Sequence, residues 1–525
     1  MHRRSHAWEQ ADAALCERVV GDSAPVTTLQ AFPRLVTSAA DDGPTPHAPS
    51  EPLSSPTAGA STPSLMRERR VLVIATRFPP AASVGATRIR KHVKYLGDFG
   101  WRPVVLTGAL PADNDGLDMA TPGVDRQSLF DVPTDVIVHR LGEFWENWPK
   151  NLSAQVGDWM DRLARMTSLG ASNWVDRIAW RLQAFHDRFA FPDRGIWRIG
   201  AAVRAALRLH RHHRFDAIYS SGMPFSDHLI ALAVRKIICR PWIAEFRDPW
   251  VEYIHWDQWN SPRGRRLAER AEAAVMRNAS RVVSVNDAMT ARFAERYATI
   301  PRRKFVTVEN GFDPSDFNRD ESDAKSKRAA DRFRLVYAGS LYDTRRPDVV
   351  LEGFRRFLEG NPEARAIATF DFYGRVGPHA GLLDVPAYSN CVRHYGLVSH
   401  AMATQAMLEA DVNVVILPKM SGGALDSTAK VYECLGSGRP ILAVVPADGA
   451  AAKTLARFQG VSICEPDDAA AIASAIAGWF ARRIANSPDQ VRSLSSLAPL
   501  TRRYQTGRLA EIMNEVAGRR RKLRG

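Results

Sequence analysis

Two successive series of buried-strand patterns constrain the fold of this chain more than any other feature. The first series consists of five short apolar runs separated by helix-like stretches: 71–75, 104–106, 217–219, 242–244 and 282–285. The second begins after the turn signal Asn310-Gly311 and a polar stretch, and its runs are 335–338, 370–373, 412–417, 441–445 and 461–463. Such alternation is typical of parallel βαβ units. The sequence therefore predicts an α/β fold with two doubly wound, Rossmann-like halves.

Length and composition narrow the class of protein. With 525 residues the chain has room for two or three domains, and no run of about 18 uncharged apolar residues interrupts it. Its five cysteines are scattered without a Cys-x-x-Cys spacing, which argues against a disulfide framework or a thiolate zinc site and favours the reducing cytoplasm. The net charge of +14 favours an anionic partner: nucleic acid, an anionic membrane or a phosphate-bearing ligand.

The first 68 residues differ from the rest. A stretch rich in Pro, Ser, Thr and Ala from Asp41 to Leu65 has no aromatic residue and no helical or strand period, so we expect a disordered tail at 1–68. The tail also lacks the apolar segment of a secretory signal. Met66 directly precedes Arg-Glu-Arg-Arg, and we hypothesise that translation begins there. A mass spectrum of the native protein that retains the first 65 residues would contradict this.

The loop and helix after the run ending at Leu417 are the first candidate site. Ser427 is the predicted N-cap of a helix over 428–436, and the free N–H groups of such a helix start suit a phosphate. Lys430 and Glu433 lie three residues apart on one face, which offers a cation for phosphate and a carboxylate for sugar hydroxyls. The alternative is an ordinary Lys–Glu pair on a solvated helix face.

Further candidates follow other strands. Gly339 and Ser340 end the first strand of the second half, and Arg345-Arg346 in the next loop could clamp a diphosphate, unless they form only a basic loop. In the first half, Gly85 allows a ligand close to the backbone, although no Gly-x-Gly-x-x-Gly or Walker-type loop is present. Arg247-Asp248 directly follows a strand, where an internal ion pair is the alternative.

Taken in order, these motifs resemble family 4 of the retaining, nucleotide-sugar-dependent glycosyltransferases, which have the GT-B fold. The resemblance runs from about residue 69 to about residue 515. The motifs that carry it are Phe78-Pro79-Pro80 with Gly85 and Arg88; Pro224-Phe225-Ser226 with His228; Phe246-Arg247-Asp248-Pro249-Trp250; Asn310-Gly311-Phe312-Asp313; Gly339-Ser340-Leu341 with Arg345-Arg346; Gly396 with His400; and Lys430-Val431-Tyr432-Glu433 with Gly438-Arg439-Pro440.

The resemblance implies two Rossmann-like domains facing each other across a cleft. The expected organisation is a disordered tail at 1–68, an acceptor domain at 69–312 with an aromatic helical insertion at about 144–197, a donor domain at 313–500, and a C-terminal helix with a basic tail at 501–525. A stripe of apolar residues beside arginines at 175–189 in the insertion predicts either a helix packed on its own domain or a surface resting on anionic lipid.

The resemblance also assigns roles to residues. Arg345 lies where the family has its phosphate-binding Lys, Arg346 replaces a Gly, and Glu433 matches the second Glu of the family's pair, on the ribose. Leu425 occupies the position of the first Glu, which leaves the sugar contacts to Asp426, to backbone amides or to Lys430. The expected catalytic residues are Arg345 and Lys430; the donor-binding residues are Gly339, Ser340, Arg346, Ser427, Thr428, Glu433, Arg375 and Val398; and the acceptor or phosphate side holds Gly85, Arg88, Arg247 and Asp248.

The implied activity is metal-independent transfer of a sugar from a nucleotide diphosphate-sugar to a glycan or lipid-linked acceptor, with retention of configuration and no cofactor. The only Asp-x-Asp, at 113–115, lies in a loop flanked by Pro and Gly and predicts a turn rather than a metal site at a strand end. The alternatives are a nucleotide-sugar 2-epimerase of the same fold, or a basic nucleic-acid- or membrane-binding protein without catalysis. No nucleic-acid recognition motif accompanies the charge. We expect a cytoplasmic protein. Three features suggest the separate hypothesis of contact with the inner face of the cell membrane: the Trp-rich insertion from Phe144, the basic C-terminus at 518–525, and the apolar residues of a final helix at 501–517.

Overall fold

The structure is a computed structural model. It describes residues 68–82, 84–109, 123–142, 191–252, 262–317, 332–341, 344–383, 390–419, 428–487 and 494–522. Most of the predicted tail at 1–68 and most of the aromatic insertion predicted at about 144–197 lie outside these residues; of the two, only residue 68 and residues 191–197 are described. All the elements described below belong to one compact unit, residues 66–525.

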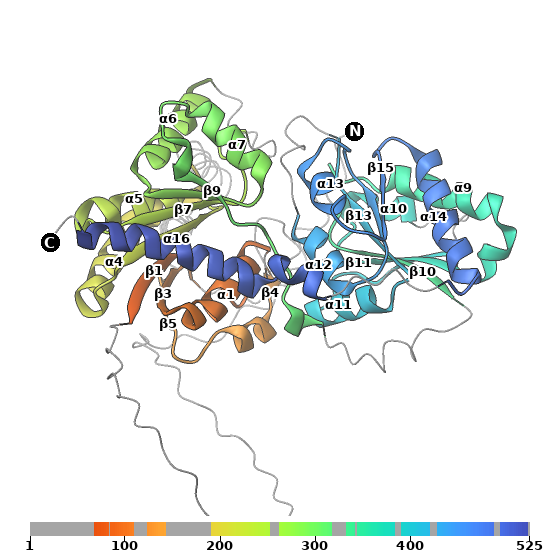
Figure 1. Cartoon of the computed structure of the whole chain (residues 1–525), viewed down its shortest axis with the longest axis horizontal. Helices are drawn as coiled ribbons and strands as arrows, with labels where there is room; N and C mark the ends of the chain where they lie inside the picture. The colour runs from red at the N-terminus through yellow and green to blue at the C-terminus, as the bar shows by residue number, and fades with distance from the viewer. Residues whose placement is uncertain are drawn as a thin grey trace, which may run out of the picture. The chain divides into compact units, whose positions relative to one another are not determined.

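A seven-stranded parallel sheet forms the first half of this unit (Figure 1). Its order is β5-β3-β1-β6-β7-β8-β9. The strands are β1 (Arg69–Ile74), β3 (Trp101–Thr107), β5 (Ile137–Arg140), β6 (Ala217–Gly222), β7 (Trp242–Phe246), β8 (Arg281–Ser284) and β9 (Phe305–Thr307). Two short segments, β2 (Ala81–Ala82) and β4 (Gly123–Val124), pair antiparallel beside it.

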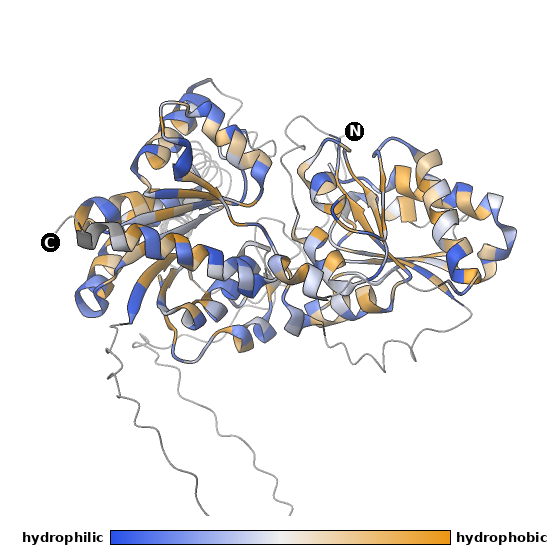
Figure 2. Cartoon of the chain, in the orientation of Figure 1, coloured by the Kyte–Doolittle hydropathy of each residue, from blue (hydrophilic) through white to orange (hydrophobic). Residues whose placement is uncertain are grey.

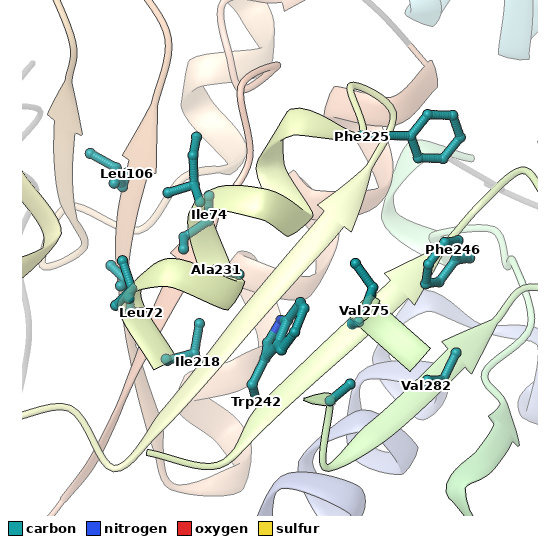
Figure 3. Close-up of a cluster of buried hydrophobic side chains, with 14 of the residues drawn as sticks. Leu72, Ile74, Leu106, Ile218, Phe225, Ala231, Trp242, Phe246, Val275 and Val282 are labelled. Atoms are coloured by element: carbon teal, nitrogen blue, oxygen red, sulfur yellow. The ribbon is translucent and has the colours of Figure 1, made fainter. Parts of the chain in front are cut away.

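Helices cover both faces of this sheet because its central strands are apolar on both sides. Along β1, Val71 and Val73 belong to one core cluster, and Leu72 and Ile74 to the other. The second cluster, which includes Trp242 and Phe225, is drawn in Figure 3. The helices are α1 (Val84–Leu96), α4 (Ile199–His213), α5 (Ser226–Ile238), α6 (Pro262–Asn278) and α7 (Asp287–Arg296), with short 3-10 turns η1 (Gly97–Phe99), η2 (Arg126–Asp131), η3 (Arg194–Arg198) and η5 (Arg302–Lys304).

A six-stranded parallel sheet forms the second half, in the order β12-β11-β10-β13-β14-β15. The strands are β10 (Phe333–Ala338), β11 (Ala368–Tyr373), β12 (Val392–His394), β13 (Val412–Ile416), β14 (Ile441–Val444) and β15 (Val461–Cys464). The prediction of two parallel, doubly wound halves is therefore confirmed. Figure 2 shows orange along most of the strands and alternating blue and orange along the helices, as expected for buried sheets covered by amphipathic helices.

The helices of the second half divide between the two faces of its sheet. Residues of α9 and α14 pack with Leu335 and Phe370, whereas residues of α11, α12 and α13 pack with Val336 and Val415. The helices are α9 (Asp348–Gly360), α10 (Ala380–Leu383), α11 (His400–Glu409), α12 (Ala429–Ser437), α13 (Ala450–Leu455), α14 (Ala469–Ile484) and α15 (Leu494–Leu497), with 3-10 turns η6 (Pro314–Asp316), η7 (Pro362–Ala366), η8 (Gly377–His379) and η11 (Ala498–Leu500).

The last helix, α16 (Arg502–Lys522), returns to the first half. Its residues Leu509, Ile512, Met513 and Val516 are at most 7% exposed and belong to the core cluster that contains Val71. The hypothesis that these apolar residues rest on a membrane is therefore wrong, because they already pack against α1 and the first sheet. No helix among the described residues has the length and apolarity needed to cross a bilayer.

The two chain segments that connect the halves run side by side. Phe312 forms a parallel bridge with Thr501; its N–H donates to the carbonyl of Leu500 at 3.1 Å, and its own carbonyl accepts from the N–H of Arg502 at 2.8 Å. The ring of Phe312 is 2% exposed and packs in the core of the second half.

A buried ion cluster ties α1 to the first of these connections. The ammonium of Lys91, whose side chain is 1% exposed, lies 2.7 Å from Asp131, 2.8 Å from Asp313 and 2.7 Å from Asp316. Lys94 donates to Asp131 and Asp313 at 3.0 Å. Because three carboxylates converge on one buried cation, this cluster fixes residues 313–316 against α1.

Candidate functional site

The loops after β10 and β11 form a backbone-lined edge. Gly339 directly follows β10, and its N–H donates to the carbonyl of Tyr373 at 2.7 Å. Gly374 directly follows β11 with φ +136°, and a Cβ there would overlap the carbonyl of Gly339. Only glycine satisfies both conditions. Polar backbone groups are thus concentrated at the carboxyl ends of two adjacent strands, where ligands of doubly wound sheets bind.

Helix α12 begins beside this edge. Its N-cap is Thr428, whose hydroxyl accepts from the N–H of Lys430 at 3.4 Å. The predicted cap, Ser427, is therefore wrong by one residue, and Ser427 itself lies outside the described residues. The helix start brings free N–H groups and a partial positive charge to the carboxyl edge of the sheet.

Lys430 connects the helix to the glycine edge. A Cβ added to Gly339 would lie 3.5 Å from Cε of Lys430, so the structure brings these two predicted residues together. The ammonium of Lys430 also forms an ion pair with Glu433 at 3.0 Å. The pair is only partly solvated, with side chains 30% and 12% exposed, so it differs from the freely solvated pair considered as the alternative.

The charges of this pair support each other. Burial raises the pKa of Glu433, but Lys430 and then His400 outweigh it, and the pKa is lowered overall. Burial disfavours the charged form of Lys430, but Glu433 raises its pKa overall. His400 lies 3.6 Å from Glu433 and was given no role from the sequence, although its place in the Gly396–His400 motif was the available signal.

The predicted phosphate clamp is less compact. Arg346 is 61% exposed and pairs at 3.2 Å with Asp348, the first residue of α9, so its side chain lies at the start of that helix. Arg345 is only partly exposed in the same loop. The carbonyl of Arg375 accepts from the N–H of Leu341 at 2.7 Å, which joins the loops after β10 and β11, and Val398 packs against the apolar core nearby.

In the first half, Gly85 and Arg247 meet. A Cβ on Gly85 would overlap the guanidinium of Arg247, so α1 begins in direct contact with that side chain. Arg247 donates from Nε to the carbonyl of Gly222 at 2.9 Å and from Nη2 to the carbonyl of Met223. These contacts hold the guanidinium at the carboxyl ends of β1, β6 and β7, and Asp248 follows it, half-buried.

Arg88 is placed differently from the prediction. It is 1% exposed and donates to Glu245 at 2.7 and 3.0 Å, to Asn310 at 3.1 Å, and to the carbonyls of Val308 and Glu309 at 2.8 Å. Burial alone would raise the pKa of Glu245, but Arg88 outweighs it and lowers the pKa to about 2. With its donors engaged in these internal bonds, Arg88 supports the fold rather than a ligand.

A substitution at Gly85 tests whether the position of Arg247 is used. Gly85→Ala should displace the flexible guanidinium with little change in melting temperature. It should lower kcat/KM for the sugar transfer that the family resemblance implies by about tenfold to hundredfold. Gly200→Ala is the matched control, since Gly200 is also the second residue of a helix but has open space around its Cβ position. Equal kinetics for Gly85→Ala and wild type would show that Arg247 takes no part in transfer.

In the part of the chain that the structure describes, no group of three or more His, Cys, Asp and Glu side chains is arranged to hold a metal ion. What the site does offer is positive charge: a lysine and a helix start at the edge of the second sheet, and an arginine at the edge of the first. Such an arrangement can stabilise an anionic group such as a diphosphate.

Comparison with known sequences supports the family resemblance over part of the chain. The model of Glycosyltransferase Family 4 matches residues 166–316, which include β6 to β9 and the Arg247-Asp248 step. None of the curated proteins matches the sequence.

Comparison with solved structures confirms the fold. Sucrose-phosphate synthase from Thermosynechococcus elongatus aligns with a TM-score of 0.52 at 15% identity, over 87% of this chain and 98% of the other. Alr3699/HepE from Anabaena, solved in complex with UDP, gives 0.51 at 13% identity over 87% and 99%. The N-terminal domain of trehalose-6-phosphate phosphatase from Candida albicans gives 0.52 at 13% identity over 85% and 97%. At these identities the likeness shows the architecture, which is the predicted GT-B arrangement.

Proposed function

We propose that this protein is a glycosyltransferase of the GT-B type that moves a sugar from a nucleotide diphosphate-sugar to a glycan or lipid-linked acceptor. The match of residues 166–316 to the family 4 model supports this. The observation that carries the proposal is the meeting of Gly339, Lys430 and Glu433 at the carboxyl edge of the second sheet. A backbone approach, a cation and a carboxylate suit the phosphates and hydroxyls of one sugar nucleotide.

The proposed chemistry requires charge stabilisation above all. The bond between the anomeric carbon and the diphosphate breaks, the acceptor oxygen bonds to that carbon on the same face, and the acceptor proton passes to the departing phosphate. Lys430, Arg345 and the N–H groups at the start of α12 would neutralise the diphosphate as it leaves. On this proposal configuration is retained, and neither a metal nor a cofactor takes part.

Glu433 is proposed to bind the ribose. Its carboxylate stays ionised at neutral pH because its pKa is lowered, so it is an acceptor for hydroxyl donors. Gly339, Ser340 and Thr428 would contact the phosphates, and Arg375 and Val398 lie beside the proposed base subsite. On the other half, Arg247, with Gly85 and Asp248, would face the acceptor. We propose that the enzyme acts in the cytoplasm in cell-surface glycan synthesis.

A thermal-shift panel tests donor binding directly. UDP is the first nucleotide to test, because the similar Alr3699/HepE was solved with it; GDP, ADP and their sugar conjugates complete the panel. A nucleotide at 100 times its Kd should stabilise the protein by about 2.7 kcal/mol. We expect one nucleotide to raise the melting temperature of wild type and to have little effect on Glu433→Ala or Arg345→Ala.

Two matched variants control for nonspecific effects. Glu363→Ala and Arg365→Ala change exposed residues of η7, away from the proposed site. The nucleotide should raise the melting temperatures of both variants as much as that of wild type. If no nucleotide shifts wild type at millimolar concentration, or if Glu433→Ala responds fully, the donor site is placed wrongly. Product analysis with and without acceptor then separates transfer from epimerisation.

A further inference from the structure

One edge of the first sheet is strongly basic. The chain reaches the amino ends of β6, β7, β8 and β9 through residues 210–216, 235–241, 277–281 and 301–304, which we call the amino-edge band. The band contains ten Arg and Lys residues but one acidic residue, Asp216, and it also holds three histidines. Because these four strands are parallel and adjacent, the four segments lie along a single edge.

Part of this charge serves the fold. Cations at helix C-termini stabilise the helix dipole, and α4, α5 and α6 all end in the band. Arg235 donates to the carbonyl of Asn278 at 2.6 Å, and Lys304 donates to the carbonyl of Arg277 at 2.8 Å. Burial, together with the nearby Arg235 and Arg281, lowers the pKa of Lys304 to about 8, which shows how closely the positive charges are spaced.

The remaining charge faces solvent. Arg211, Lys236, Arg302 and Arg303 are exposed, and Ile237, beside Lys236, is 58% exposed. An apolar side chain among cations suits the interface between lipid headgroups and acyl chains better than it suits a purely ionic partner.

Helix α16 also passes along the amino ends of the strands. Glu515 of α16 pairs with Arg281 at the start of β8, and Asn514 accepts from Trp101 Nε1 at 3.0 Å, at the start of β3. The backbone of α16 then continues to Lys522 through a run of arginines at 519–521. Figure 1 shows the end of α16 on the same side of the picture as α4 and α5.

We propose that the amino-edge band docks the protein on a bilayer of anionic phospholipids. Clusters of four to eight Lys and Arg residues bind anionic lipid through their summed attraction. The band lies opposite the carboxyl edge that holds Gly85 and Arg247, so docking leaves the proposed substrate site uncovered. The inference deepens the proposed function and rests on it in one respect: docking on a membrane would bring the enzyme close to a lipid-linked acceptor. The amino-edge band also replaces the buried face of α16 as the proposed membrane contact.

Vesicle flotation of the full-length protein tests this docking. In 150 mM salt we expect wild type to float with vesicles of phosphatidylglycerol and phosphatidylcholine but not with phosphatidylcholine alone. The triple variant Arg211→Glu, Lys236→Glu, Arg303→Glu should lose about a hundredfold in partition coefficient. The control, Arg365→Glu, Arg393→Glu, Arg482→Glu, reverses as many exposed charges in the second half and should bind like wild type.

Three outcomes would overturn the proposal: equal binding to neutral and anionic vesicles, equal losses for both triple variants, or tighter binding of the band to duplex DNA than to anionic vesicles at the same salt. The last outcome would assign the band to nucleic acid. Melting curves verify that both variants fold. Because the nucleotide thermal shift is measured without vesicles, a failure of docking leaves the donor-site result unchanged, and the reverse also holds.

Discussion

Replacing Lys91 by methionine is expected to lower the free energy of unfolding by about 3–5 kcal/mol, because three carboxylates lose their shared buried cation. Asp313 retains Lys94 and the hydroxyl of Tyr95, which donates to it at 2.8 Å, so part of the cluster persists. Urea denaturation at pH 7 measures the change. Lys236→Met, which removes an exposed lysine, should change stability by less than about 0.5 kcal/mol.

The pH dependence gives this prediction a second readout. Burial raises the pKa of Asp313 and of Asp131, but Lys91 outweighs it at both, and each pKa is lowered in the folded state. A carboxylate with a depressed folded pKa contributes stability above its unfolded pKa of about 3.9, and this stability is lost as the pH falls through the folded pKa. Wild type should therefore lose more stability than Lys91→Met between pH 5 and pH 3. Two results would contradict the role given to Lys91: equal loss of stability with falling pH in wild type and Lys91→Met, or a decrease of less than about 1 kcal/mol in the free energy of unfolding of Lys91→Met at pH 7.

Replacing Lys430 by methionine is expected to lower the rate of sugar transfer by about a hundredfold to a thousandfold, as removal of a single donor to a developing anion does in other enzymes. The measurement is the initial rate of nucleoside diphosphate release from the sugar nucleotide that stabilises wild type. Lys430→Arg keeps the charge and should recover part of the rate.

Lys453→Met is the control for this variant, because Lys453 is an exposed lysine of α13. Removing Lys430 also frees Glu433, so the pKa of Glu433 should rise and nucleotide binding should weaken below neutral pH. An unchanged transfer rate in Lys430→Met would exclude Lys430 from stabilising the leaving group.

The sequence predicted the central strands and the edge strand β15, and it missed the three other edge strands. Continuous apolar runs marked β1, β6, β7, β10, β13 and β14, all covered on both faces by helices. The missed strands β5 and β9 end the first sheet, and β12 ends the second. Each is three or four residues long and partly exposed, so an apolar run was never required there. Strands buried on two faces carry a continuous apolar run, whereas of the four edge strands only β15, with Val461 and Ile463, carried enough apolar residues to be predicted.

The candidate site shows a similar division. Lys430 and Glu433 were predicted together because their spacing on one helix is local, and the structure records the ion pair. Arg88 was assigned to the acceptor or phosphate side from the family resemblance, but it pairs with Glu245, which is 157 positions away. Contacts at such separations depend on the packing of whole sheets and leave no periodic signal in the sequence.

The path of α16 has a consequence for synthesis of the protein on the ribosome. Leu509, Ala510 and Met513 complete the apolar core beneath β1, yet they emerge only after every strand of both sheets has been made. The first half is translated hundreds of residues earlier, and until α16 follows, α1 covers this face of the sheet without those side chains. We therefore expect a chain that stops before residue 509 to leave apolar side chains of this face in contact with water, and such exposed apolar surface favours aggregation.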